Sequence, residues 1–138
     1  MNYREEYQRK LRTAREAVQV VRSGDWIDFG WCASAPETLD AALAERWEEL
    51  YDVKARGAVL TWRPKMFSVP DTAEHFTWHS WHFSGLERKM MEEGIAWYIP
   101  LRYSELLRYY RENVDPIRAA MLQVAPMDEE GYFSFGLS

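Results

Sequence analysis

Apolar residues recur along this chain with two different spacings, and each spacing predicts one kind of element. Near the start they stand three or four positions apart from Tyr7 to Val21, which is the period of a helix buried along one side. Elsewhere they form short uninterrupted runs, such as Ile95 to Ile99, which are typical of strands. After the opening helix, which ends before Gly24, the pattern predicts strand 26–31, helix 36–50, strand 55–62, helix 84–93, strand 95–99, helix 104–113, strand 119–124, a polar turn at 127–131 and an extended stretch at 132–135.

Local signals mark where several of these elements begin and end. Ser34 and Ser84 are each followed three residues later by a glutamate, which is the capping-box spacing at the start of a helix. Gly24 and Gly94 suit the left-handed position just after a helix. Residues 63–82 contain two prolines, few periodic positions and many aromatic residues, so we predict a long loop there.

The alternation of helices and strands predicts an α/β fold with an open, mostly parallel sheet and flanking helices. Parallel strands need crossover connections, and these are right-handed in nearly all cases. Ligands bind such sheets beyond the carboxyl ends of the strands, where we expect Trp31–Pro36, residues 63–70 and the turn near Asp128. We therefore predict that the loop at Ser34–Pro36 and the turn at Asp128–Phe133 open onto the same cleft.

Composition and charge narrow the class of protein. The 138 residues suffice for one domain with its own core. Seventeen basic and 22 acidic residues give a net charge of −5 without a basic stripe, which argues against nucleic acid as a partner. No apolar stretch is long enough for a membrane span, the first 22 residues are too charged for a signal peptide, and a lone cysteine favours a reduced, cytoplasmic setting. Aromatic residues make up 15% of the chain, which predicts adhesive surface for a partner or a second copy.

Several familiar catalytic signatures are missing from the sequence. Its seven glycines do not have the spacing of a dinucleotide-binding or P-loop motif, and there is no G-x-S-x-G elbow. His75, His79 and His82 would share one face of a helix and could there bind zinc, but the aromatic residues among them favour packing. Cys32 lies between a strand end and a helix start, so it is either an activated thiol or, as is more usual, a small buried side chain.

Two loops have the best chemistry for binding. Residues 31–36 combine a strand end, small side chains and the free N–H groups of a helix start, which suit a carboxylate or a phosphate, with an ordinary turn as the equal alternative. Residues 126–133 form an acidic turn between two apolar stretches, for which a solvated hairpin is the simpler interpretation. Arg88 and Lys89 fit a solvated helix face, although they would also suit a phosphorylated ligand.

Three stretches carry a family resemblance. They are YREEYQRKLRTAREAVQVVRSGDWIDFG at the start, SWHFSGLERKMMEEG in the middle and QVAPMDEEGYFSFGLS at the end. Together they resemble the first third of the acetyl-CoA hydrolase/transferase family, which includes butyryl-CoA:acetate and 4-hydroxybutyrate CoA-transferases. The last stretch is the most specific, because an Asp, a Gly and an aromatic residue recur in the family at that spacing after an apolar strand.

The resemblance implies a protein of two similar α/β halves, in which residues 1–138 are the N-terminal domain and the C-terminal catalytic half is absent. In the family, a glutamate of the second half attacks the acyl-CoA and forms a glutamyl-CoA thioester, and the CoA is then transferred to a small carboxylate such as acetate. No catalytic residue and no metal ligand is therefore assigned in this chain. Coenzyme A is expected as a substrate, without a further cofactor.

The resemblance also implies substrate-binding residues and partners. The substrate-binding residues are Trp31, Ser34, Ala35 and Pro36 in the loop that faces the acyl group, and Asp128, Gly131, Tyr132 and Phe133 in the turn near the cleft between the halves. The expected partners are the C-terminal half of the same enzyme, the acyl-CoA and carboxylate substrates, and a second copy of the protein. An acyl-CoA hydrolase half, a non-catalytic interaction domain and a small zinc-binding module remain as alternatives.

Overall fold

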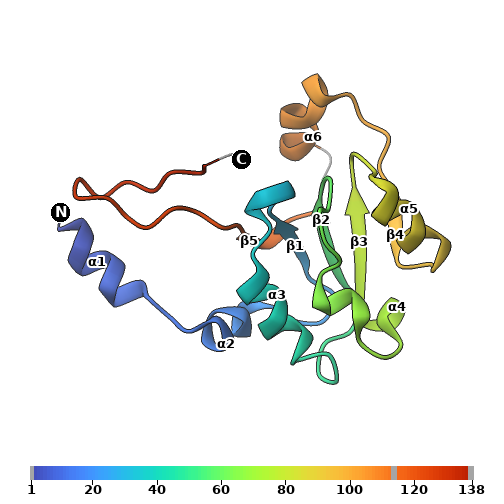
Figure 1. The fold of residues 1–138 in the computed structure, drawn as a ribbon, viewed down its shortest axis with the longest axis horizontal. Coiled ribbons are helices and arrows are strands. Elements are labelled where there is room, and N and C mark those ends of the chain that lie inside the picture. Colours follow the sequence, from blue (N-terminus) through green and yellow to red (C-terminus); the bar gives the residue numbers. More distant parts are fainter. Residues whose placement is uncertain (1, 113–114, 137–138) are drawn as a thin grey trace.

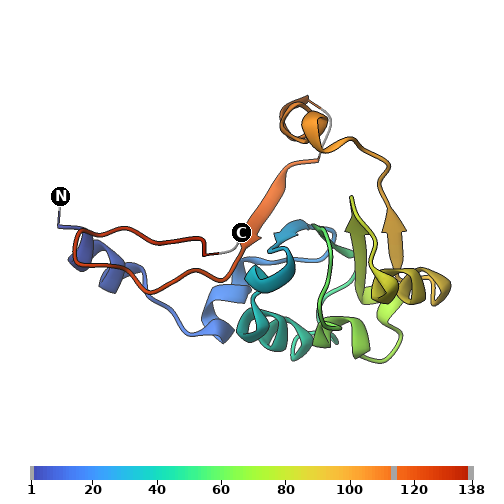
Figure 2. The same cartoon turned by 45° about the horizontal axis from the view of Figure 1, so that its top comes forward.

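The computed structural model describes residues 2–112 and 115–136, which form one five-stranded sheet with flanking helices (Figures 1 and 2). In sheet order β4-β3-β2-β1-β5, all four neighbouring pairs are parallel. The strands are β1 (Trp26–Phe29), β2 (Val53–Gly57), β3 (Phe76–Ser80), β4 (Ala96–Tyr98) and β5 (Ile117–Met121). The helices are α1 (Tyr3–Lys10), α2 (Ala14–Ala17), α3 (Glu37–Ala44), α4 (Thr72–His75), α5 (Gly85–Glu92) and α6 (Leu106–Glu112), with the 3₁₀ turns η1 (Val18–Val20), η2 (Cys32–Ser34), η3 (Lys65–Ser68) and η4 (Tyr103–Glu105).

The predicted fold class is confirmed, since the sheet is open and parallel. The predicted strands 26–31 and 119–124 correspond to β1 and β5, which are neighbours with Asp28 opposite Ala120. The strands β1 to β4 follow one another in a single direction across the sheet, and β5 is then placed on the other side of β1. A reversal of strand order of this kind leaves a crevice beyond the carboxyl ends of the two strands on either side of the reversal, here β1 and β5.

The prediction of a long loop over residues 63–82 is wrong. This segment contains η3, α4 and β3, which pairs with β2 on one side and β4 on the other. Phe76 and Trp78 are fully buried, while Thr77 and His79, which alternate with them, face the other side of the sheet. Both prolines precede the strand, one at the start of η3 and one just before α4, so they do not interrupt it. Clustered aromatic residues obscured a strand that alternates normally.

Several predicted boundaries also move. The opening helix is in fact two helices, because the Thr13 hydroxyl and the Glu16 carboxylate form a capping box that starts α2. Predicted helix 36–50 ends as α3 at Ala44, predicted strand 55–62 is β2 at Val53–Gly57, and the remaining predicted elements match α5, β4, α6 and β5 with ends moved by one to three residues. Asn113, the last residue of predicted helix 104–113, lies outside the described residues.

Only one of the two predicted capping boxes is present. At the start of α5, the Ser84 hydroxyl and the Glu87 carboxylate form the expected box. At the start of α3 there is no side-chain cap, and Ser34 instead donates its hydroxyl to the backbone oxygen of Trp31 at 2.7 Å. The prediction at Ser34 failed because its side chain is used by the preceding turn, which competes for the same short-range bonds.

The two faces of the sheet are covered very differently. One face presents Ile27, Phe29, Ala55, Phe76 and Trp78, all fully or nearly fully buried, to α3, α5 and the turns η1 and η3, and this is the hydrophobic core. Along the other face the strands present alternate residues that are mostly polar or aromatic, and α6 covers one end of it. These residues are Trp26, Asp28, Lys54, Arg56, Thr77, His79 and Trp97.

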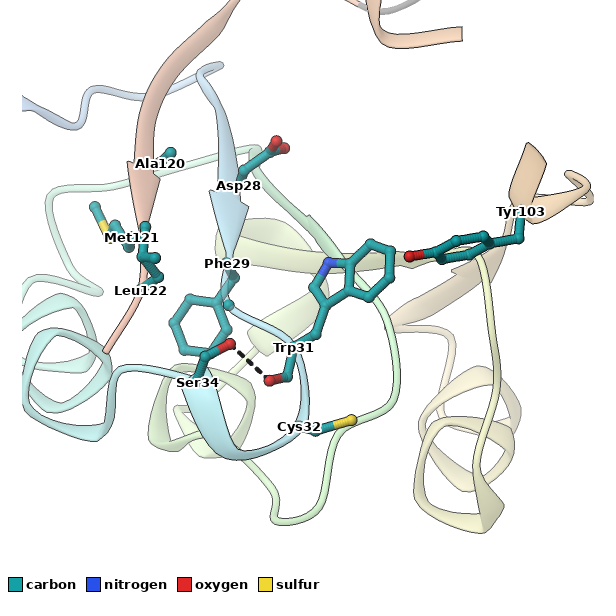
Figure 3. A pocket seen from close by; sticks show the side chains of 10 residues that line it. Asp28, Phe29, Trp31, Cys32, Ser34, Tyr103, Ala120, Met121 and Leu122 are labelled. Carbon is teal, nitrogen blue, oxygen red and sulfur yellow. Dashed lines mark hydrogen bonds between the residues drawn. The ribbon is translucent and has the colours of Figure 1, made fainter. Parts of the chain in front are cut away.

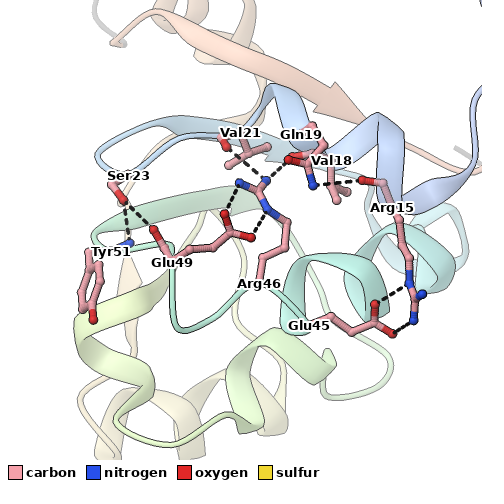
Figure 4. A network of polar contacts seen from close by, with 9 residues as sticks. All are labelled: Arg15, Val18, Gln19, Val21, Ser23, Glu45, Arg46, Glu49 and Tyr51. Carbon is pink, nitrogen blue, oxygen red and sulfur yellow. Dashed lines mark hydrogen bonds and ion pairs between the residues drawn. The ribbon is translucent and has the colours of Figure 1, made fainter.

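A polar network fastens the N-terminal helices to the core (Figure 4). Arg46, just after α3, donates to the backbone oxygens of Val18 and Val21 and forms an ion pair with Glu49 at 2.9 Å. Arg15 of α2 forms a second, exposed ion pair with Glu45 at 2.8 Å. Arg46 thus joins the end of α3 to both ends of the short turn η1.

Candidate functional site

A pocket of about 460 Å³ lies where the crevice is expected, at the carboxyl ends of β1 and β5 (Figure 3). Its walls are mainly apolar, with a few polar groups among them. The lining residues are Asp28, Phe29, Gly30, Trp31, Cys32, Ser34, Tyr103, Ala120, Met121 and Leu122. A pocket of this size and lining, with few polar groups, is typical of a small-molecule site.

The loop after β1 is held in place by backbone bonds to two other segments. Gly30 donates to the Met121 oxygen at 2.7 Å, and Gln123 donates back to the Ser34 oxygen at 2.8 Å, so the loop is tied to the end of β5. A Cβ at Gly30 would lie 2.2 Å from the Ser34 oxygen, so only glycine permits this close approach. On the other side Cys32 donates to the Val59 oxygen at 3.1 Å.

Two residues of this region have strained backbones. Cys32 and Val59 have φ values of +46° and +42°, in the left-handed region that side chains disfavour, most strongly a branched one such as valine. Their backbones are joined by the bond just described, and Val59 in turn donates to the His82 oxygen at 3.2 Å. Hydrogen bonds therefore connect the loops after β1, β2 and β3 along one edge of the sheet. Backbone strain of the kind seen at Cys32 and Val59 concentrates at functional sites.

Two aromatic rings form the rim of the pocket. The Trp31 and Tyr103 rings lie edge to face with centroids 6.5 Å apart, and Figure 3 shows them side by side above the loop. Tyr103 is 83% exposed. The rim is therefore an open aromatic surface, while the floor, formed by Phe29 and Met121, is buried.

A buried ion pair borders the pocket on the open face of the sheet. The Nε of Arg56 donates to the Asp28 carboxylate at 3.0 Å, and the guanidinium lies 5.2 Å from the centre of the Trp26 ring and 4.9 Å from that of Tyr110. Arg56 is 2% exposed, and its Nη2 has no hydrogen-bond partner among the described residues. Burial raises the pKa of the Asp28 carboxyl, although the Arg56 charge acts against this.

The neighbouring His79 stays neutral at ordinary pH. Burial lowers its pKa to about 4, and the positive charges of Lys54 and Arg56 add to the effect. Its ring packs against Trp26 with centroids 4.7 Å apart, and its Nε2 is 3.1 Å from the Thr77 hydroxyl. The open face thus carries a cationic, aromatic cluster beside the pocket.

The structure brings two of the four predicted residues of this loop to the pocket. Trp31 and Ser34 line it. Ala35 is nearly fully buried and Pro36 stands at the start of α3, so these two hold the loop against the helix.

The predicted turn lies elsewhere, and the expectation that both loops open onto one cleft is wrong in this chain. After Leu122 the chain leaves the sheet as an extended arm, residues 122–136, which runs beside α1 (Figures 1 and 2). Asp128 accepts the N–H groups of Glu130 and Tyr132 at 2.9 and 2.8 Å and so forms the tip of the arm.

Contacts with α1 explain why the turn stays away from the pocket. Gly131, with φ of +93°, lies so close to α1 that a Cβ there would be 2.9 Å from that of Tyr3, and the Phe133 ring lies 5.7 Å from that of Tyr7. The two ends of the arm, but not its tip, lie near the loop after β1, where Ser34, Gln123 and Phe135 are among the residues that line a pocket of about 290 Å³.

The three histidines do not share a helix face. His75 ends α4 and is buried with its Nδ1 2.8 Å from the Leu50 oxygen, His79 lies on β3, and His82 follows that strand. In the part of the chain that the structure describes, no group of three His, Cys, Asp or Glu residues is arranged to hold a metal ion. Over the same residues, no helix is both long and apolar enough to cross a membrane.

Several pocket residues escaped the sequence analysis. Met121 and Leu122 were assigned to a strand, and the reversal that puts its end beside β1 is not visible in the sequence. Tyr103 reaches the rim from a turn far along the chain. Asp28 could have been identified from the sequence as a candidate site residue. It is a charged residue directly between two apolar ones, Ile27 and Phe29, in a predicted strand.

An open parallel sheet with a pocket at the reversal of its strand order defines an α/β ligand-binding domain. Residues 1–138 match the acetyl-CoA hydrolase/transferase N-terminal domain, and the chain belongs to that family. The predicted resemblance is thereby confirmed.

The relatives are larger proteins. The chain is 53% identical over its whole length to butyryl-CoA:acetate CoA-transferase of Anaerostipes caccae, and 39% identical over 96% of its length to a probable butyrate:acetyl-CoA coenzyme A-transferase of Syntrophomonas wolfei. It spans 31% and 29% of these two proteins. Among solved structures, RipA from Yersinia pestis matches 98% of this chain with a TM-score of 0.82 at 26% identity, and the chain covers 33% of RipA.

Proposed function

We propose that this domain forms the N-terminal wall of the acyl-CoA site of a CoA-transferase, which moves CoA between an acyl-CoA and a small carboxylate such as acetate. The observation that carries the proposal is the largely apolar pocket at the reversal between β1 and β5. The names of the relatives, which pair butyryl-CoA or butyrate with acetate or acetyl-CoA, support a short acyl chain as the apolar ligand.

The pocket residues suit the acyl end of such a substrate. Phe29, Met121 and Leu122 offer apolar surface to a short chain, and each Å² buried contributes about 25 cal/mol. Trp31 and Tyr103 form an exposed aromatic rim, and a bound substrate that excludes water there favours transfer to a carboxylate over hydrolysis. Ser34 orients the loop, because its hydroxyl is already donated to Trp31.

The nucleophile in this proposal is a glutamate of the C-terminal region, which forms the glutamyl-CoA thioester. The candidates in this chain are poorly suited to that step. Asp28 is held by Arg56 at 3.0 Å, and the residues that line the pocket include no histidine that could activate Cys32. We further propose that the turn at Asp128–Phe133, whose Tyr132 is exposed, contacts the C-terminal region at a place separate from the acyl pocket.

An acyl-transfer assay tests the proposal. Butyryl-CoA and acetate are supplied to the chain of residues 1–138 alone, and then to the same chain expressed together with the C-terminal region. We expect acetyl-CoA to form only in the second case. Acetyl-CoA formed by the chain alone and abolished by C32A or E129A would assign the nucleophile to this domain. CoA release without acetyl-CoA would identify a hydrolase, and inactivity of two halves shown to associate would favour a non-catalytic interaction domain.

A further inference from the structure

A second pocket, of about 510 Å³, lies on the same edge of the sheet as the first. It is lined by His82, Phe83, Arg88, Met91 and Tyr98. His82 and Phe83 follow the carboxyl end of β3, Tyr98 ends β4, and the other two belong to α5. Whereas the first pocket is mainly apolar, this one combines two basic side chains with two aromatic rings and contains no carboxylate among its lining residues.

Buried polar contacts fix the walls of this second pocket. The Glu87 carboxylate is fully buried and accepts the N–H groups of Leu60 and Ser84, at 2.9 and 2.5 Å, so the start of α5 is locked to the loop after β2. The end of β4 is held because Ile99 donates to the Ser80 oxygen at 2.8 Å. A site on such rigid supports is largely formed before any ligand binds.

The lining groups have unused binding capacity. The His82 ring and the Arg88 guanidinium have no hydrogen-bond or ion-pair partner within residues 2–112 and 115–136. The Phe83 and Tyr98 rings meet edge to face with centroids 5.4 Å apart, and Tyr98 is half exposed. An arginine binds phosphate oxygens in a forked geometry, and exposed rings stack on a planar base. Although the whole chain has a net charge of −5, this pocket has basic side chains and no carboxylate, so it is suited to an aromatic anion.

The spacing of the two pockets suits a single long ligand. In the order β4-β3-β2-β1-β5, three strand spacings separate the β3–β4 gap from the β1–β5 gap. At ~4.8 Å each they amount to about 14 Å along one edge. Acyl-CoA has a small apolar acyl group at one end and a phosphorylated adenosine at the other, joined by a flexible chain. We infer that the second pocket binds the adenine nucleotide end of acyl-CoA, with Arg88 on a phosphate, while the first pocket takes the acyl end.

This inference rests on the proposed function, and kinetics of the full-length enzyme test it. The variant R88A is compared with K89A, which removes the next positive charge on the same helix, outside the pocket. The substrates are butyryl-CoA and butyryl-pantetheine, which lacks the nucleotide. We expect R88A to raise KM for butyryl-CoA roughly fivefold, with kcat and the KM for butyryl-pantetheine unchanged. R88K should recover part of the loss, and K89A should match the wild type.

A binding measurement separates this inference from the proposed function. The full-length protein and its R88A variant are titrated with 3′-phosphoadenosine 5′-diphosphate and with ADP. If no acyl transfer is detected but the first compound binds through Arg88, the proposed function fails and the nucleotide pocket stands. If transfer proceeds and R88A changes KM for both acyl substrates equally, or for neither, the nucleotide pocket is overturned. R88A-sensitive ADP binding, with an unchanged KM for butyryl-CoA, would identify a site for free nucleotides and overturn the assignment to CoA.

Discussion

The two faces of the sheet differ in composition and in what they contribute to the domain. The face under α3 and α5 is built from fully buried apolar side chains such as Phe76 and Trp78. The opposite face carries the Asp28–Arg56 ion pair and His79 and is covered at one end by α6. One face therefore supplies stability through buried apolar area, while the other places charged and aromatic groups beside the pocket at a cost in desolvation.

The largest effect is expected from a cavity on the core face. Phe76→Ala should lower the free energy of unfolding by about 4 kcal/mol, because it removes a fully buried ring from between β3 and the helices. Thr77→Ala, one residue along on the other face, is the matched control and should cost less than about 1 kcal/mol. Urea unfolding of both variants measures the difference. Equal losses would mean that the open face is as tightly packed as the core.

The second effect comes from breaking the ion pair on the open face. Asp28→Ala leaves the Arg56 guanidinium buried without its carboxylate partner, which should cost about 2 to 3 kcal/mol. The double variant D28A/R56M removes both charges and should recover most of that loss. If the double variant is no more stable than D28A alone, the loss comes from packing around Asp28 rather than from the unpaired charge.

A smaller effect is expected from the titration of His79. Its pKa is lowered to about 4, so the folded state binds the proton less readily than the unfolded state, whose histidine titrates near 6.5. The resulting stability is fully present above pH 6.5 and is lost as the pH falls through 4. Because the ring is partly exposed, we expect a loss of about 1 kcal/mol rather than the full value. H79Q should flatten the pH dependence of unfolding in this range.

The smallest effect on stability is expected at the rim of the pocket. Tyr103→Ala should change the free energy of unfolding by less than about 0.5 kcal/mol, since the side chain is 83% exposed. If the proposed function holds, the same change in the full-length protein should nevertheless raise KM for butyryl-CoA on the order of threefold, because the ring forms the rim of the site with Trp31. An unchanged KM would remove Tyr103 from the proposed acyl site.

An element could be predicted from the sequence when the contacts that fix its position lie close together along the chain. The start of α5 was predicted because Ser84 and Glu87 bond each other within one turn. The start of α3 was not, because Ser34 has a competing partner in Trp31. The strand β3 was missed because Phe76 and Trp78 read as part of an aromatic cluster, although they alternate with polar residues as a half-covered strand requires.

The same dependence on nearby contacts explains why one of the two predicted loops of the candidate site lies at the pocket and the other does not. The loop at Trp31 follows directly from the end of β1, so its place at the carboxyl edge could be predicted from the strand alone. The position of the turn at Asp128–Phe133 depends on contacts across the whole chain, between Gly131 and Tyr3 and between Phe133 and Tyr7. A family resemblance assigns such a turn a role, but its location in this structure follows from α1.

The strand order has a consequence for how the domain is made. A ribosome adds roughly 5–20 residues per second, and the N-terminal part of a chain can fold while the rest is being synthesised. The strands β1 to β4 and the helices of the core are complete before β5, the last strand, emerges and pairs with β1, the first. This late, long-range pairing builds the second wall of the pocket. During synthesis the nascent chain can therefore gain most of its core before it gains its binding site.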